Sequence, residues 1–174
     1  MFSRDTVSHN GYLMQTGIRP MEKNFEEQRV EATNKIYDPI IPDICFEYLD
    51  KMQRLCEENG ATLVLIKSPT NSSTYWWYDE WDEQISEYAV ENGLDYYNFI
   101  EDENIGIDWS TDTYDRGLHL NVYGAEKFTE YFGQIITEKY SLSDERENKD
   151  LSAYWEDKID SYYNEKKCKE NDEK

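Results

Sequence analysis

The chain has 174 residues, which is the length of one domain, and a formal net charge of −20. Phosphate backbones and anionic membranes are bound by clustered Lys and Arg, so this charge argues against nucleic acid or a membrane surface as a partner. No apolar run approaches the roughly 20 residues of a membrane-spanning helix, and no signal-peptide pattern follows Met1, so we expect a soluble chain without membrane insertion.

The aromatic content indicates a folded segment: the chain contains 15 Tyr, 6 Phe and 5 Trp residues, and disordered chains are poor in such side chains. Three cysteines, at positions 45, 56 and 168, form no CxxC motif. Cys45 and Cys56 fall on the apolar face of a predicted helix, which favours a core position over a disulfide or a metal site.

Residues 1–42 show no sustained periodicity and carry turn signals and prolines, so we expect an irregular segment that wraps the surface. Asp43 then offers a helix N-cap, and Asn59-Gly60 offers a stop. Between them, apolar residues recur at helical spacing at Cys45, Leu49, Met52 and Cys56, joined by Phe46 and Leu55. The run at 62–66 is of strand length and continuously apolar, which is typical of a parallel strand buried on both faces.

A polar loop at 68–73 separates this strand from a second predicted helix, at about 74–91, which is aromatic at its start. Residues 94–100 are predicted to form a second strand, and an acidic loop follows at 101–117. Asn121 caps a third helix with a clear apolar stripe. Residues 141–174 are predicted to form a charged, partly helical tail, with a polar helix near 150–165 and a frayed end.

This order of helices and strands predicts an α/β fold with a parallel sheet. We divide the chain into the irregular segment 1–42, the α/β segment 43–140 and the tail 141–174. Only two strands are convincing, whereas a two-stranded sheet is marginally stable by itself. We therefore expect apolar faces of 62–66 and 94–100 to be left exposed.

The segment from Asp112 to Gly124 carries the most informative chemistry. His119 is one of only two histidines, and it lies just before a capped helix with carboxylates four and seven residues earlier, Asp115 and Asp112. An imidazole near the carboxyl ends of parallel strands can act as a general base whose tautomer a carboxylate holds. A capping or surface histidine is the simpler alternative.

This segment resembles the last conserved block of SGNH (GDSL-type) hydrolases, in which an Asp and a His precede a helix. The likeness covers roughly residues 43–140 and is closest to bacterial cell-envelope members. It implies a three-layer α/β/α, flavodoxin-like fold. It also implies that His119 is the general base and Asp115 its orienting carboxylate. Because the family spacing is Asp-x-x-His, Asp112 is an alternative to Asp115.

The chain departs from this family in one respect that bears on activity. No Gly-x-Ser occurs anywhere in the sequence, and the first strands and the oxyanion-hole residues of the family are not found before residue 43. We interpret the chain as an N-terminally truncated SGNH polypeptide that is inactive alone. The resemblance implies a parent protein that hydrolyses or transfers a small ester or acyl group on a cell-envelope glycan, outside the cytoplasmic membrane or anchored to it. No cofactor or metal is required.

Three further residues are candidate substrate contacts: Ser68 and Asn71 in the loop after the first strand, and Trp76 at the start of the second helix. A turn-forming loop and an aromatic helix packed on the sheet are the simpler readings. The alternative function is a non-catalytic remnant or binding module that engages a partner through the Trp-rich or the acidic surface. The oligomeric state is left open by the sequence.

Overall fold

The computed structural model describes residues 12–24, 27, 39–72, 78–100 and 102–172. The chain forms two compact units. Unit 1 consists of residues 1–21 and 104–174, and unit 2 consists of residues 22–103. The predicted Asp-His segment lies in unit 1.

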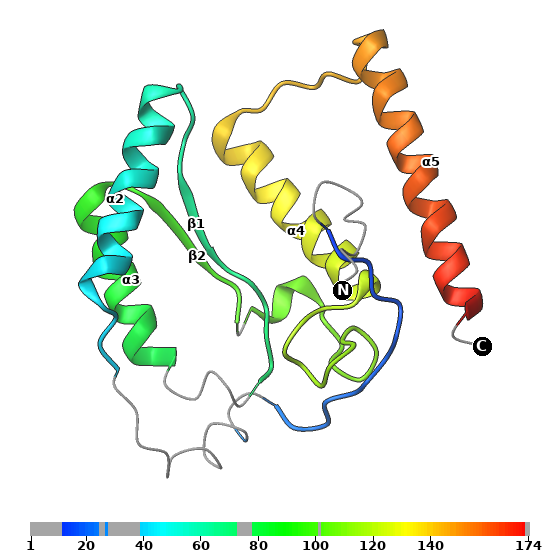
Figure 1. Cartoon of the computed structure of the whole chain (residues 1–174), viewed down its shortest axis with the longest axis horizontal. Coiled ribbons are helices and arrows are strands. Elements are labelled where there is room, and N and C mark those ends of the chain that lie inside the picture. The colour runs from blue at the N-terminus through cyan, green and yellow to red at the C-terminus, as the bar shows by residue number, and fades with distance from the viewer. Residues whose placement is uncertain (1–11, 25–26, 28–38, 73–77, 101, 173–174) are drawn as a thin grey trace, which may run out of the picture. The chain divides into compact units, whose positions relative to one another are not determined.

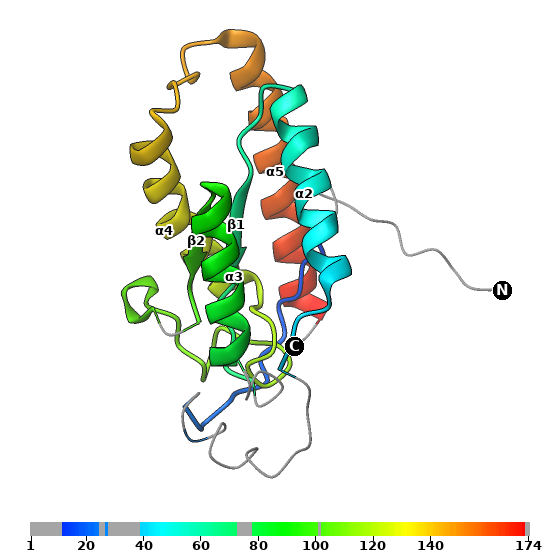
Figure 2. The same ribbon diagram turned by 90° about the vertical axis from the view of Figure 1, so that its left-hand side faces the viewer.

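Unit 2 contains a two-stranded parallel sheet of β1 (Val64–Lys67) and β2 (Asp95–Asn98), paired in the register Val64 to Asp95. Helices α2 (Asp43–Glu58) and α3 (Tyr78–Asn92) lie on the same side of this sheet (Figures 1 and 2). A parallel pair needs a crossover connection, which α3 supplies. The predicted α/β class and the predicted parallel pairing are therefore confirmed.

The face that α2 turns toward α3 agrees with the predicted one only in part, since Phe46 and Leu49 are half-buried but Met52 is exposed. The Phe46 and Tyr88 rings lie 5.2 Å apart, and the Tyr88 hydroxyl donates to Asp50 Oδ1 at 2.7 Å. No residue of α2 is buried, Cys45 is exposed and Cys56 is half-buried, so the prediction of two core cysteines is wrong. The reason is a rotation of the contact face, because polar residues such as Asp50 pack against α3.

The start of α2 also differs by one residue. Pro42 occupies the N-cap position without a side-chain cap, and Asp43 is the first helical residue. Its end agrees with the predicted stop, because Asn59 is the C-cap and Gly60 adopts a positive φ of 65°. The strand β1 is half-buried rather than buried on both faces, and Ile66 is 44% exposed. This exposure agrees with a sheet that has two strands among the described residues. The expected exposure of 94–100 is wrong, because β2 is half-buried and residues 99–100 are buried.

Unit 1 is built around α4 (Val122–Tyr140) and α5 (Lys149–Asp172), which run antiparallel (Figure 1). A short 3-10 helix, η3 (Glu103–Ile105), lies where the sequence passes between the two units. The core of unit 1 includes Met14 and Val122, which are 1% and 0% exposed.

The tail is more regular than predicted. Helix α5 has 24 residues and continues to Asp172, so the expectation of a frayed end after 165 is wrong for the described residues. The C-terminal half of α5 contacts α4, since Glu170 accepts from the Tyr123 hydroxyl at 2.9 Å. In the N-terminal half of α5, large apolar side chains are about half exposed, for example Trp155 (55%) and Ile159 (50%). None of the described helices is long and apolar enough to cross a membrane.

Candidate functional site

The loop between η3 and α4 is folded back on itself, which places His119 and Asp115 together. Thr113 and Leu120 form an isolated antiparallel bridge. The Thr113 hydroxyl donates to the carbonyl of His119 at 2.9 Å and accepts from the Gly117 N–H at 2.7 Å. Gly117 has a φ of 88°, a conformation that favours glycine. The turn at 114–119 is therefore closed by one fully buried threonine.

His119 pairs with Asp115 through both its ring and its backbone. The distance from His119 Nδ1 to Asp115 Oδ2 is 2.6 Å, and the His119 N–H donates to Oδ1 at 2.8 Å. The Tyr114 ring stacks on the imidazole, with centroids 5.8 Å apart and planes 9° apart. The His119 side chain is 59% exposed. A carboxylate on Nδ1 holds the proton there, which leaves Nε2 as the basic nitrogen of an accessible ring.

Asp112 has different partners from Asp115. Its Oδ2 lies 2.6 Å from Lys127 Nζ and accepts from the Asp108 N–H at 2.8 Å, and the residue is 2% exposed. Asp112 is thus a buried anchor between the loop and α4, and it has no hydrogen bond to His119 among the described residues. Of the two carboxylates left open by the sequence, the geometry favours Asp115 as the partner of His119.

Asn121 holds the far end of the loop. It is the N-cap of α4, as predicted, and its side chain accepts from the N–H groups of Tyr123 and Gly124. Its amide also donates to the carbonyls of Thr111, at 2.7 Å, and Gly17, at 3.1 Å. The side chain is fully buried. One asparagine therefore fixes the loop, the helix start and the N-terminal segment together.

The N-terminal segment at 12–21 is part of the site's scaffold, which the sequence did not predict. Its backbone is hydrogen-bonded to the loop, from the Arg19 N–H to the Thr113 carbonyl at 3.0 Å and from the Met21 N–H to the Trp109 carbonyl at 2.9 Å. The buried side chains of Met14 and Thr16 alternate along it. Burial at every second residue is typical of an extended segment, and the spacing of Met14 and Thr16 is the local signal for it in the sequence.

The three predicted substrate contacts belong to unit 2, apart from the Asp-His pair. Ser68 is exposed and follows β1. Asn71 is 2% exposed, and its amide donates to the carbonyl of Lys23 at 2.8 Å, which gives it a structural use. Trp76 lies outside the described residues. Ser68 and Asn71 are therefore not assigned to the site that contains His119.

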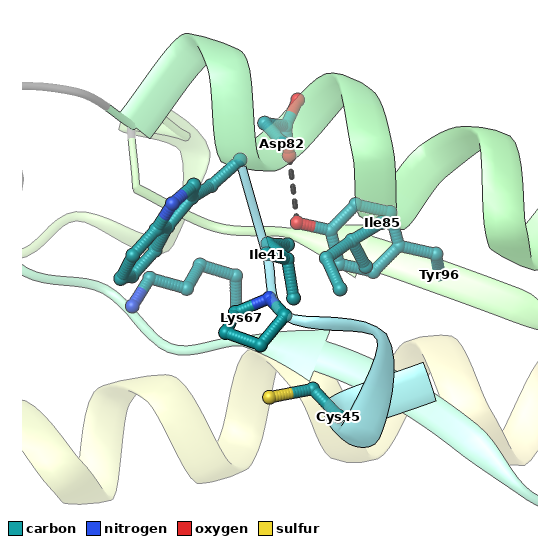
Figure 3. A pocket seen from close by; sticks show the side chains of 8 residues that line it. Ile41, Cys45, Lys67, Asp82, Ile85 and Tyr96 are labelled. Atoms are coloured by element: carbon teal, nitrogen blue, oxygen red, sulfur yellow. Dashed lines mark hydrogen bonds between the residues drawn. The ribbon is translucent and has the colours of Figure 1, made fainter. Parts of the chain in front are cut away.

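Unit 2 has a cavity of its own that the sequence did not predict. Its volume is about 270 Å³, and its walls include Ile41, Cys45, Trp81 and Ile85. Figure 3 shows the Tyr96 hydroxyl turned toward Asp82 of α3, a hydrogen bond of 2.6 Å. The lining is mostly apolar and includes Cys45 of α2. Among the described residues, no group of three His, Cys, Asp or Glu side chains could hold a metal ion.

The sequence did not predict two residues that surround the Asp-His pair. Tyr114 supplies the stacking face for His119, and Lys127 neutralises Asp112. Tyr114 precedes Asp115 directly, so its presence was visible but its orientation was not. Burial, and then the negative charge of Asp115, raises the pKa of the Tyr114 hydroxyl above 10.0. That hydroxyl is therefore protonated at physiological pH.

Comparison of the chain with protein-family models, with curated proteins and with solved structures finds no match. The assignment of a function therefore depends on the geometry of the Asp-His site and on the resemblance of its residues to a known block.

Proposed function

We propose that this chain is the C-terminal part of an SGNH-type hydrolase with a flavodoxin-like three-layer fold, in which His119 is the general base and Asp115 orients it. The observation that carries the proposal is the Nδ1–Oδ2 distance of 2.6 Å in a ring that is 59% exposed. A histidine used only for capping has no need of a carboxylate on Nδ1 together with an open Nε2. The helix–strand order of unit 2 supports the fold.

The chemistry is that of a serine esterase. A serine hydroxyl attacks the carbonyl carbon of an ester, and His119 Nε2 takes the proton of that hydroxyl. The alcohol leaves with the same proton, and an acyl-serine forms. Water or an acceptor hydroxyl then attacks the acyl group, with His119 again taking and returning the proton. Asp115 keeps the proton on Nδ1 and stabilises the imidazolium in both steps.

The nucleophile and the oxyanion donors come from outside the described residues. Among those residues, the contacts of His119 are with Asp115, Tyr114 and Thr113, and none is with a serine. No Gly-x-Ser occurs in the sequence. A base without these groups cannot form or stabilise the tetrahedral intermediate, so residues 1–174 alone are proposed to have little or no esterase activity.

The substrate class and location follow from the resemblance to cell-envelope members of this superfamily. We assign a small ester or the O-acyl group of a cell-envelope glycan as substrate, and the outer side of the cytoplasmic membrane as the place of action. The net charge of −20 is compatible with a neutral glycan and unsuited to polyanionic substrates.

The test uses the full-length product of the gene, with p-nitrophenyl acetate as substrate. His119→Ala should lower kcat/KM by about 10²- to 10⁴-fold, the contribution of a positioned general base. The matched control is His9→Ala, which removes the other histidine of the chain. Equal activity of the His119→Ala and unmodified proteins would exclude His119 as the base.

The second candidate function is a non-catalytic binding module, favoured by the lack of a serine contact to His119 among the described residues. Reading the genomic DNA upstream of Met1 in all three frames separates the two. A strand followed by Gly-x-Ser supports the hydrolase, and its absence supports the binding module. Purified 1–174 should not be labelled at serine by a fluorophosphonate probe. Stoichiometric labelling that His119→Ala abolishes would mean that a serine such as Ser68 is the nucleophile.

A further inference from the structure

A second cavity lies within unit 1, and it differs from the apolar cavity of unit 2 in its chemistry. Its volume is about 590 Å³, within the range of about 300–1,000 Å³ typical of ligand sites. Its polar and aromatic lining comes from three parts of the unit: the N-terminal segment, α4 and α5. The side chains used below are those of Tyr12, Glu126, Glu130, Tyr162 and Tyr163.

The aromatic side of this cavity consists of three tyrosine rings. The ring centroids of Tyr12 and Tyr162 lie 6.5 Å apart with planes tilted by 30°. Those of Tyr162 and Tyr163 lie 5.4 Å apart with planes at 82°, so the rings present faces in different directions. The face of an aromatic ring carries negative electrostatic potential and attracts a cation within about 6 Å of its centroid. Tyrosines at such angles can surround a cation from more than one side.

Two carboxylates, those of Glu126 and Glu130, line the same cavity. Glu126 accepts from the Tyr162 hydroxyl at 2.9 Å. Glu130 is exposed and has no hydrogen-bond or ion-pair partner among the described residues. Burial, followed by the charge of Glu126, raises the pKa of Tyr12. Burial, followed by the hydrogen bond to Glu126, raises the pKa of Tyr162, so both rings are neutral phenols at physiological pH. The cavity therefore offers phenol rings and negative charge.

The unit already binds one ammonium group in this manner next to the cavity. Lys166 of α5 places its Nζ 4.9 Å from the centroid of the Tyr123 ring and 2.8 Å from each carboxylate oxygen of Glu126. The lysine side chain is only 15% exposed. The contact between α4 and α5 thus already holds a cation between an aromatic face and a carboxylate. Glu126 takes part both in this contact and in the lining of the cavity.

We propose that the cavity lined by Tyr12, Tyr162, Tyr163, Glu126 and Glu130 binds a small organic cation bearing a quaternary ammonium group. Three aromatic rings suit a weakly hydrated cation whose charge is spread over methyl groups. Lys166 neutralises Glu126, so the charge that balances the ligand is that of Glu130. This site involves neither His119 nor Asp115, and it is independent of the esterase proposal.

The test is a titration of the full chain with choline, followed by NMR shifts of the tyrosine ring protons. Its matched ligand is 3,3-dimethyl-1-butanol, which has the same shape and no charge. Choline should give saturable shifts at Tyr162 and Tyr163, and the neutral alcohol should give none. Absence of saturation by choline, or equal binding of the alcohol, would overturn the proposal.

Two variants separate the site from the general attraction of a strongly negative chain. Tyr163→Ala leaves the net charge unchanged and should raise the Kd for choline about two- to fivefold, the effect of one exposed ring. Glu130→Gln should raise it similarly. The controls are Tyr154→Ala, at an exposed ring of α5, and Glu147→Gln, at an exposed carboxylate of the α4–α5 connection. Equal effects of the site and control variants would contradict a built site.

Discussion

Lys127 Nζ lies 2.6 Å from Asp112 Oδ2, in an ion pair whose carboxylate side chain is 3% exposed and whose lysine side chain is 43% exposed. The lysine also donates to the carbonyl of Gly106 at 3.1 Å. The pair joins the first turns of α4 to the loop that carries Asp115 and His119. The stability of the candidate site therefore depends on a charge pair that takes no part in its proposed chemistry.

Replacing Lys127 by Met should destabilise unit 1 by about 2 kcal/mol, because it leaves a buried carboxylate without its counter-charge. The cost is below that of a fully buried pair because water reaches the lysine and because the Asp108 N–H still donates to Asp112. Urea unfolding, followed by hydrogen exchange of amides in 104–140, measures the effect. Lys167→Met, at an exposed lysine of α5, is the control and should change stability little. Equal effects of the two substitutions would refute the role given to Lys127.

Gly124→Ala and Gly133→Ala, both within α4, should change stability in opposite directions. A Cβ at Gly124 would lie 2.6 Å from the carbonyl oxygen and 3.0 Å from the Cβ of Asp112, whereas a Cβ at Gly133 would meet nothing within 4 Å. Backbone must move to admit the first methyl group, at a cost of about 1–3 kcal/mol. The second substitution should stabilise the helix by about 0.5–1 kcal/mol. Thermal unfolding of both variants tests this, and stabilisation by Gly124→Ala would show that the loop can yield.

Local signals predicted individual elements in both units. The apolar run that became β1, the stop at Asn59-Gly60 and the cap at Asn121 each depend on neighbours within a few residues. Gly124 lies close to Asp112, in a space that a Cβ would fill, which no local signal specified. The α/β class follows from such signals because they fix the order of helices and strands without any knowledge of distant contacts.

Long-range contacts decided what the sequence left open. Asp112 and Asp115 are both close to His119 in the chain, and their spacing alone gave no choice between them. The choice depends on Lys127, which lies 15 residues after Asp112, and on the pairing of residues 12–21 with the loop. Similarly, the apolar spacing of α2 did not tell which of its residues meet α3, and Phe46 packs there because Tyr88 lies opposite. No periodicity encodes that partner.

Asp115→Asn should change the tautomer of His119, whereas Asp112→Asn should leave it unchanged. The Asp115 carboxylate holds the proton on Nδ1, and an amide in its place accepts more weakly and can donate to Nδ1 instead. Asp112 bonds to Lys127 and Asp108 and has no hydrogen bond to His119 among the described residues. Imidazole ¹⁵N shifts, recorded at a pH where His119 is neutral, distinguish a proton on Nδ1 from one on Nε2. A tautomer that responds to Asp112→Asn and is insensitive to Asp115→Asn would reassign the orienting carboxylate.

Tyr88→Phe should reduce the dependence of stability on alkaline pH. Burial, followed by the hydrogen bond to Asp50, raises the pKa of Tyr88 from 10.0 to about 12. Between these values the unfolded chain releases a proton that the folded chain keeps, so the stability from this hydroxyl is complete below pH 10 and is lost as the pH rises through 12.

The unmodified chain should therefore exceed Tyr88→Phe in free energy of unfolding by about 1.5–3 kcal/mol at pH 8, the value of a hydrogen bond to a charged group. This difference should shrink through pH 10–12, since the other tyrosines titrate equally in both proteins. Urea unfolding at a series of pH values measures it. Tyr48→Phe, at a tyrosine of α2 that is 59% exposed and has no hydrogen bond among the described residues, should show no such difference. A gap between the unmodified chain and Tyr88→Phe that stays constant to pH 12 would mean that the hydroxyl of Tyr88 ionises alike in the folded and unfolded chains.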